Sequence, residues 1–96
     1  MSEIPPFTVI TANGSYEIKT RSGHEHLLTL KDDFGGGTVT MTSKNNADGS
    51  YTAVSGGSWT GDAEIRFHAP SDEIRLTLAS STSPNILVNL LPIYTR

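Results

Sequence analysis

The chain has 96 residues, a formal net charge of −3 and no cysteine. Its length fits one domain, because two halves would each fall near the lower size limit for an independent hydrophobic core. The lack of cysteine excludes disulfide bonds, thiolate zinc sites and cysteine nucleophiles, and the weak, scattered charge offers neither a basic stripe for nucleic acid nor a polybasic patch for a membrane.

The chain begins with MSEIPPF, in which Pro5 and Pro6 fix the backbone angle φ and remove two hydrogen-bond donors. We therefore expect residues 1–6 to form an extended N-terminal arm. This start lacks the basic and apolar regions of a signal peptide, so we expect no secretion signal. No apolar run approaches the ~20 residues of a membrane helix.

The rest of the chain, residues 7–96, alternates apolar and polar side chains in short runs separated by turn residues. Asn13-Gly14 predicts a two-residue hairpin turn between the first two runs. Eight strands are predicted, over residues 7–11, 15–20, 24–30, 38–42, 50–54, 63–68, 73–78 and 85–94. Strands at this spacing, with almost no helical periodicity, predict an all-β fold, a single antiparallel β-sandwich or jelly-roll-like domain. The expected core residues are Val39, Met41, Ile65, Phe67, Ile74, Leu76 and Leu78.

His24-Glu25-His26 is the arrangement that comes nearest to a metal-binding motif. Two histidines at this spacing on a strand leave the same face and could share a zinc or iron ion, with His68 as a third ligand. A cupin-like enzyme would add a carboxylate a few residues later, but residues 27–31 contain none. We therefore expect solvated histidines, no bound metal and no cofactor.

The remaining polar residues give no catalytic constellation. No serine has a triad context, and the pairs Asp32-Asp33 and Asp72-Glu73 are neighbours along the chain, which does not place them on either side of a scissile bond. We expect the protein not to be an enzyme. Tyr51 and Trp59 are the candidate ligand platform, for a sugar, although tryptophan in a small β domain is more often a core or interface residue.

The last strand is apolar on both of its faces. Its two faces carry Ile86, Val88 and Leu90, and Leu87, Leu91 and Ile93, respectively. Because a strand that is apolar on both faces must be covered on both, we expect Leu87, Leu91 and Ile93 to contact another chain, a second copy of this one. Ile4 and Phe7 are the expected companions from the arm. The competing prediction is that residues 34–37 or 56–59 of the same chain cover this face.

Four features resemble the small β-sandwich structural proteins of tailed-bacteriophage virions. They are Asn13-Gly14, FGGGTVT at residues 34–40, Ala-Pro before IRLTL at residues 69–78, and TSPN at residues 82–85. The resemblance implies a non-enzymatic virion protein, foremost a capsid decoration (cement) protein and commonly a trimer, or else a neck, tail or fibre component. It implies the major capsid protein or another virion protein as the partner, and assembly in the host cytoplasm.

Two alternatives to this resemblance remain open. One is a carbohydrate- or receptor-binding module, such as a fibre tip, that uses Tyr51 and Trp59. The other is a small cupin-like metal enzyme that uses His24, His26 and His68.

Overall fold

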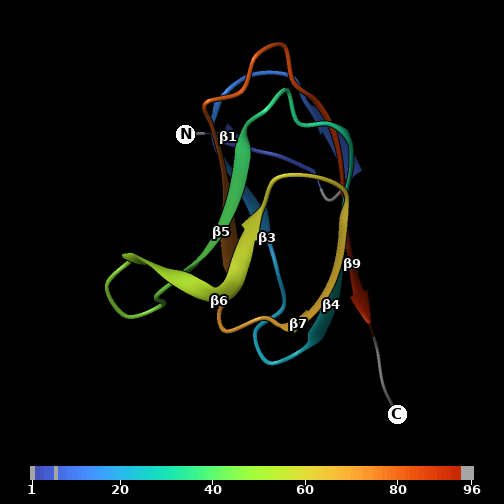
Figure 1. Ribbon diagram of the computed structural model, residues 1–96. Helices are drawn as coiled ribbons and strands as arrows, with labels where there is room; N and C mark the ends of the chain where they lie inside the picture. Colours follow the sequence, from blue (N-terminus) through green and yellow to red (C-terminus); the bar gives the residue numbers. More distant parts are fainter. Residues whose placement is uncertain (1, 6, 94–96) are drawn as a thin grey trace.

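The computed structural model describes residues 2–5 and 7–93, and within these residues every regular element is a strand. In chain order the strands are β1 (Ser2–Glu3), β2 (Phe7–Ile10), β3 (Gly14–Lys19), β4 (Glu25–Asp33), β5 (Thr38–Lys44), β6 (Tyr51–Trp59), β7 (Ala63–His68), β8 (Glu73–Ala79) and β9 (Asn85–Ile93) (Figure 1). The all-β prediction is therefore confirmed. Tyr94, predicted to end the last strand, lies outside the described residues, as do residues 1 and 6 of the predicted arm.

The strands form two sheets that pack face to face. The five-stranded sheet has the order β1-β3-β8-β5-β6, and the four-stranded sheet has the order β2-β9-β4-β7. From β2 to β9, every connection takes the chain from one sheet to the other, except the β5–β6 hairpin. Eight antiparallel strands in two layers with these crossings form a jelly-roll sandwich, as the strand spacing predicted. The added β1 pairs in parallel with β3.

The predicted hairpin across Asn13-Gly14 is wrong, because β2 pairs with β9 and β3 pairs with β8. The turn instead carries the chain between the two sheets. The Asn13 side-chain amide donates a hydrogen bond to the backbone oxygen of Ser81 at 2.9 Å, and its oxygen accepts one from the Ser81 amide at 3.0 Å. The turn residues predict a reversal of the chain, but the strand partners depend on the burial of apolar faces.

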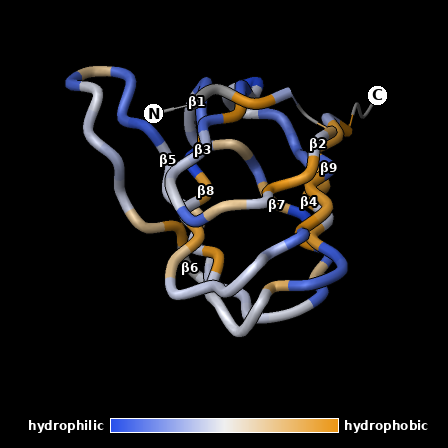
Figure 2. The backbone as a smooth tube through the Cα atoms, turned by 90° about the horizontal axis from the view of Figure 1, so that it is seen from above, coloured by the Kyte–Doolittle hydropathy of each residue, from blue (hydrophilic) through white to orange (hydrophobic). Residues whose placement is uncertain are grey.

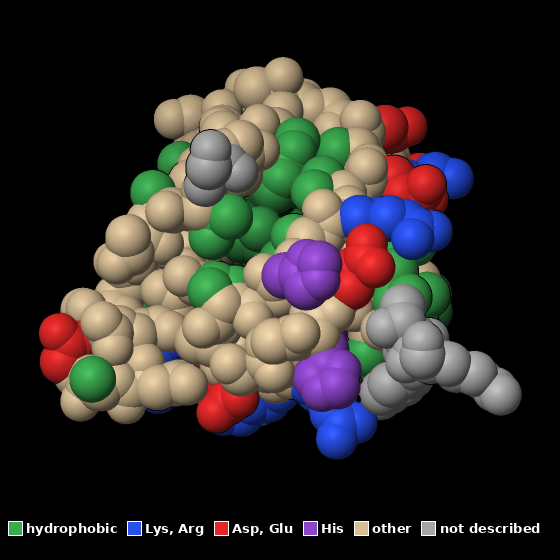
Figure 3. All heavy atoms as spheres, turned by 90° about the horizontal axis from the view of Figure 1, so that it is seen from below, with side chains coloured by type: hydrophobic (Ala, Val, Ile, Leu, Met, Phe, Trp, Pro, Cys, Tyr) green, Lys and Arg blue, Asp and Glu red, His purple; other side chains and the backbone are tan. Residues whose placement is uncertain are grey.

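The hydrophobic core lies between the two sheets. Its buried members are Ile10, Ile18, Leu28, Leu30, Phe34, Val39, Met41, Ile74, Leu76, Leu78, Ile86, Val88 and Leu90. Five of the seven residues predicted for the core are among them. Ile65 and Phe67 are only partly buried, because β7 is the edge strand of its sheet. Viewed from below, apolar side chains are visible on the surface of the molecule (Figure 3).

The first residues of the chain lie on its own five-stranded sheet. Ser2 and Glu3 pair with β3, and the amide of Ile4 donates a hydrogen bond to the backbone oxygen of Glu17 at 2.8 Å. The Ile4 side chain packs against the core. Residues 2–4 are thus bound to their own domain by backbone pairing and by apolar contact.

Candidate functional site

The outer face of the four-stranded sheet is the candidate functional site. Ile10, Val88 and Leu90 point into the core, so their odd-numbered neighbours on β2 and β9 point outward. The pairing aligns β2 with β9, and β9 with β4, so that outward side chains of the three strands lie side by side. We call this set the apolar face; it consists of Phe7, Val9, Leu27, Leu87, Leu91 and Ile93.

The apolar face is open to solvent. Phe7 is 65% exposed, Val9 46% and Leu91 49%, and the other three members are partly buried by their neighbours. Seen from above, the most apolar stretches of the backbone include β2, β9 and β4, which lie together at one side of the molecule (Figure 2). A contiguous exposed apolar patch in a small domain marks an interaction surface, because such area is otherwise removed from water.

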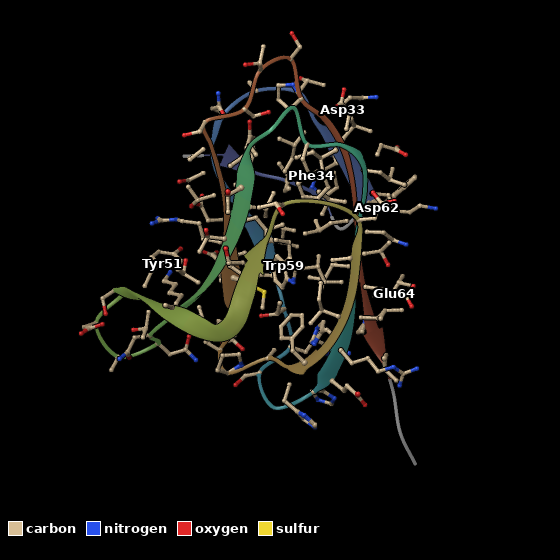
Figure 4. The ribbon with its side chains drawn as sticks, in the orientation of Figure 1. Asp33, Phe34, Tyr51, Trp59, Asp62 and Glu64 are labelled. Carbon is tan, nitrogen blue, oxygen red and sulfur yellow. The ribbon has the colours of Figure 1, made fainter. Side chains whose placement is uncertain are left out.

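Charged groups border the apolar face on the side of β7. Glu64 and Arg66 point outward from β7, and Arg66 Nη1 lies 3.8 Å from Oε2 of Glu25 on β4. Asp62 and Glu64 project from the outer side of this sheet (Figure 4). Lys31 aligns with Leu87 and adds a positive charge. The face therefore has an apolar part over β2 and β9 and a mixed-charge border over β4 and β7.

The structure brings together four of the five predicted interface residues: Phe7, Leu87, Leu91 and Ile93 share the apolar face. Ile4 does not join them, because its side chain packs against the core. Two members, Val9 and Leu27, were missed. Each is an apolar residue next to a buried apolar residue, Ile10 or Leu28, so that both faces of the strand are apolar there. The same signal on both faces identified the last strand.

The competing prediction, that residues 34–37 or 56–59 cover this face, is wrong. Phe34 is buried in the core, where it is 4% exposed. Trp59 lies on β6 of the other sheet and also packs against the core. Figure 4 shows both rings between the two layers. Neither segment supplies a side chain that shields Leu91.

Tyr51 and Trp59 lie on opposite faces of β6 and do not share a platform. Thr42 pairs with Ala53 and Thr40 with Ser58, so four residues of β6, 54–57, oppose the single residue Met41. The bulge has an odd number of extra residues, which turns the following segment over. Tyr51 consequently lies on the outer side and Trp59 between the layers (Figure 4).

The Tyr51 ring belongs to a polar network on the outer face of the five-stranded sheet. Its hydroxyl donates to Glu73 Oε2 at 2.5 Å, and the Arg75 guanidinium lies 3.7 Å from the ring centre. Glu73 Oε1 also accepts a hydrogen bond from Lys19 Nζ at 3.0 Å, and Arg75 Nε donates to Glu17 Oε2 at 3.0 Å. The network links β3, β8 and β6, and its charged and polar groups form hydrogen bonds and ion pairs with one another.

The network shifts two pKa values in opposite directions. Burial, together with the hydrogen bond to Glu73, raises the pKa of Tyr51 to about 12. The hydrogen bonds from Tyr51 and Lys19 lower the pKa of the Glu73 carboxyl. Both shifts favour the pair of a neutral phenol and an ionised carboxylate, so the network stabilises the sheet without poising a group for proton transfer near neutral pH.

The prediction of solvated histidines is wrong for His26, which is 2% exposed. Its Nε2 accepts a hydrogen bond from the Arg21 amide at 3.3 Å, so Nδ1 carries the proton and donates to the His24 backbone oxygen at 3.0 Å. The ring stacks on Phe67 with 5.8 Å between centroids. His24 and His68 are exposed, and histidine side chains are visible on the lower surface (Figure 3).

The described part of the chain contains no group of three histidine, cysteine or acidic residues placed to hold a metal ion. Both ring nitrogens of His26 are occupied by backbone groups, which explains why the His24-Glu25-His26 spacing does not produce a ligand pair.

No helix within residues 2–5 and 7–93 is long and apolar enough to cross a membrane. No family model matches this chain, and no characterised protein is significantly similar to it in sequence.

Proposed function

We propose that this protein is a non-enzymatic structural protein of a tailed-bacteriophage virion, acting as a capsid decoration (cement) protein. It stabilises the particle through protein–protein contacts. The observation that carries the proposal is the open apolar face, whose exposed side chains on β2 and β9 are not covered by any described segment of the chain. The partner, the major capsid protein or another virion protein, follows from the resemblance of the sequence.

The energetics of the apolar face favour binding in multiple copies. Full burial of a large apolar side chain contributes about 1.5–3 kcal/mol, so six that are already half-buried add roughly 6 kcal/mol together. Association costs about 4–15 kcal/mol before any net affinity appears. One copy would therefore bind weakly, whereas linked copies gain affinity by avidity without new contacts. This comparison supports a homo-oligomer as the form that binds the particle.

The charged border supplies orientation rather than affinity. Glu25, Glu64, Lys31 and Arg66 present both signs at the edge of the apolar face. Charges at the rim of an interface steer the encounter and exclude wrong partners, and they contribute little to its strength. The jelly roll itself does not decide the function, because capsid proteins, lectins and cupins share this architecture.

The alternative role as a carbohydrate- or receptor-binding module has no observation in its favour. The proposed platform residues, Tyr51 and Trp59, lie on opposite faces of β6. The Tyr51 ring is covered on one side by Arg75. The metal-enzyme alternative likewise lacks a ligand set within the described residues.

The proposal is tested by adding purified protein to particles that lack it and measuring both co-sedimentation and the temperature at which the particles release their genome. We expect the wild-type protein to bind and to raise that temperature. Leu91→Lys places a charge in the middle of the apolar face and should abolish both effects. Ala53→Lys is the matched control, because Ala53 is exposed on the outer side of the other sheet and should leave both unchanged.

Two results would contradict the proposal. One is a wild-type protein that neither sediments with the particles nor stabilises them. The other is a Leu91→Lys variant that folds and binds like the wild type, which would show that the apolar face is not the contact surface.

A further inference from the structure

The four edges of the two sheets differ in how they are protected against pairing with another strand. β1 has two residues, β6 is interrupted by the bulge at residues 54–57, and the β7 edge carries Glu64, Arg66 and His68. Short length, bulges and charges are the devices that keep an edge strand from pairing. β2, Phe7–Ile10, has four residues with no charge, glycine or proline among them. It is the least protected edge in the described structure.

We propose that β2 pairs antiparallel with β2 of a second copy of this chain, about a two-fold axis perpendicular to the sheet. Such an axis keeps the outer faces of the two copies on the same side. Residues opposite each other in an antiparallel pair point to the same side of the sheet. Outward Phe7 or Val9 must then face an outward residue of the second copy.

This condition leaves two registers with most of β2 paired. An axis through Thr8 aligns Phe7 of each copy with Val9 of the other. An axis through Val9 aligns Val9 of one copy with Val9 of the other. Cross-strand neighbours lie about 4.5–5.5 Å apart, so either register brings exposed apolar side chains of both copies into contact. The free backbone groups of the edge also find hydrogen-bond partners, which removes the cost of leaving them unpaired beneath these side chains.

The chemistry of β2 fits a second copy. A two-fold axis places identical residues near each other, which is unfavourable for a charged strand and favourable for an apolar one. The nearest charged side chains on this face, Glu25 and Lys31 of β4, lie two strands away, at about 10 Å from β2 for a spacing of about 4.8 Å per strand, and those of β7 lie one strand farther. Like charges therefore do not meet at the axis.

The area of the outer face of the four-stranded sheet gives a reason for the pairing. The 28 residues of β2, β9, β4 and β7 give one copy an outer face of about 460 Å², from a rise of about 3.4 Å per residue and a spacing of about 4.8 Å between strands. A standard interface buries about 800 Å² on each partner. Two copies joined through β2 form one eight-stranded sheet with roughly 900 Å² on the same side, which reaches that size. The use of this wider face rests on the proposed function, whereas the pairing rests on β2 itself.

The mass in solution, measured by light scattering after size exclusion, tests the pairing with two matched variants. Val9 and Leu91 are 46% and 49% exposed on the same face, but Val9 lies on the edge strand and Leu91 on the neighbouring inner strand. We expect the wild type at twice the 10.3 kDa of one chain, Val9→Lys at half the wild-type mass, and Leu91→Lys still at the wild-type mass.

The possible results separate the pairing from the proposed function. A wild-type monomer or trimer would overturn the pairing, as would a dimer that Val9→Lys leaves intact. Loss of the dimer in both variants would mean that the faces stack instead. A dimer that fails to bind particles would refute the proposed function and leave the pairing standing.

Disulfide trapping tests the register directly, because the chain has no cysteine of its own. Thr8→Cys reports an axis through Thr8, and Val9→Cys reports an axis through Val9. Either axis places the two sulfur-bearing residues within the usual 4.4–6.8 Å between Cα atoms. We expect one of these variants to form a covalent dimer rapidly under mild oxidation, and Leu91→Cys to remain uncrosslinked. If neither variant crosslinks faster than Leu91→Cys, the β2 pairing is refuted.

Discussion

Replacing Leu76 by alanine is expected to remove a large part of the stability of the domain. Leu76 is fully buried in the middle of β8, aligned with Tyr16 on one side and Met41 on the other. The substitution removes three carbon atoms, worth about 2.4 kcal/mol in transfer free energy. The cavity left between two packed sheets raises the cost to roughly 3–5 kcal/mol. A small domain has about 5–15 kcal/mol in total.

The control is Leu91→Ala, which makes the same chemical change at a residue that is 49% exposed. About half of the transfer term applies there and no cavity forms, so we expect a loss of about 1 kcal/mol. Urea unfolding followed by the fluorescence of Trp59, the single tryptophan, measures both values. The protein concentration is held fixed, because association changes apparent stability. Equal losses in the two variants would refute the assignment of Leu76 to the core and Leu91 to the surface.

Three further predictions concern backbone strain and pH. Gly35→Ala should destabilise the fold more than Gly36→Ala in urea unfolding. Both glycines have positive φ, +59° and +77°, at which a residue with a Cβ costs about 1–2 kcal/mol. Only at Gly35 would the added Cβ also collide with the Thr82 backbone. Because the pKa of Tyr51 is raised from 10.0 to about 12, its contribution to stability is complete below pH 10 and lost as the pH rises towards 12, and Tyr51→Phe should remove that loss. Because the pKa of Glu73 is lowered from 4.5, its contribution is present above pH 4.5 and lost as the pH falls through the lowered value; urea unfolding across the acid range should show this loss in the wild type and not in Glu73→Gln.

Local patterns in the sequence were sufficient to predict eight of the nine strands and four of the six residues of the apolar face. Period-two alternation identifies which side of a strand is buried, so Leu76 and Val39 were assigned to the core correctly. The doubly apolar last strand indicated an uncovered surface, and Leu91 lies on it. These inferences succeed because they depend on neighbours along the same strand.

Features that depend on distant segments were not predictable in this way. Asn13-Gly14 reverses the chain, but whether a reversal joins one sheet or two depends on which apolar faces meet. His26 is buried, and the backbone groups of Arg21 and His24 form hydrogen bonds with its ring, which a spacing of two residues does not reveal. The bulge in β6 places Tyr51 and Trp59 on opposite faces, so the candidate platform that combined them does not form.

The central claim, that this protein is a component of a virion, is tested most directly by a mass-spectrometric inventory of purified particles. Particles of a phage whose genome encodes this sequence would be purified on a density gradient, digested and quantified against the major capsid protein. A decoration protein should appear in many copies per particle and should be lost from the particles when Leu91→Lys replaces the wild type. Its absence from purified particles, with the protein abundant in the unfractionated lysate, would contradict the claim.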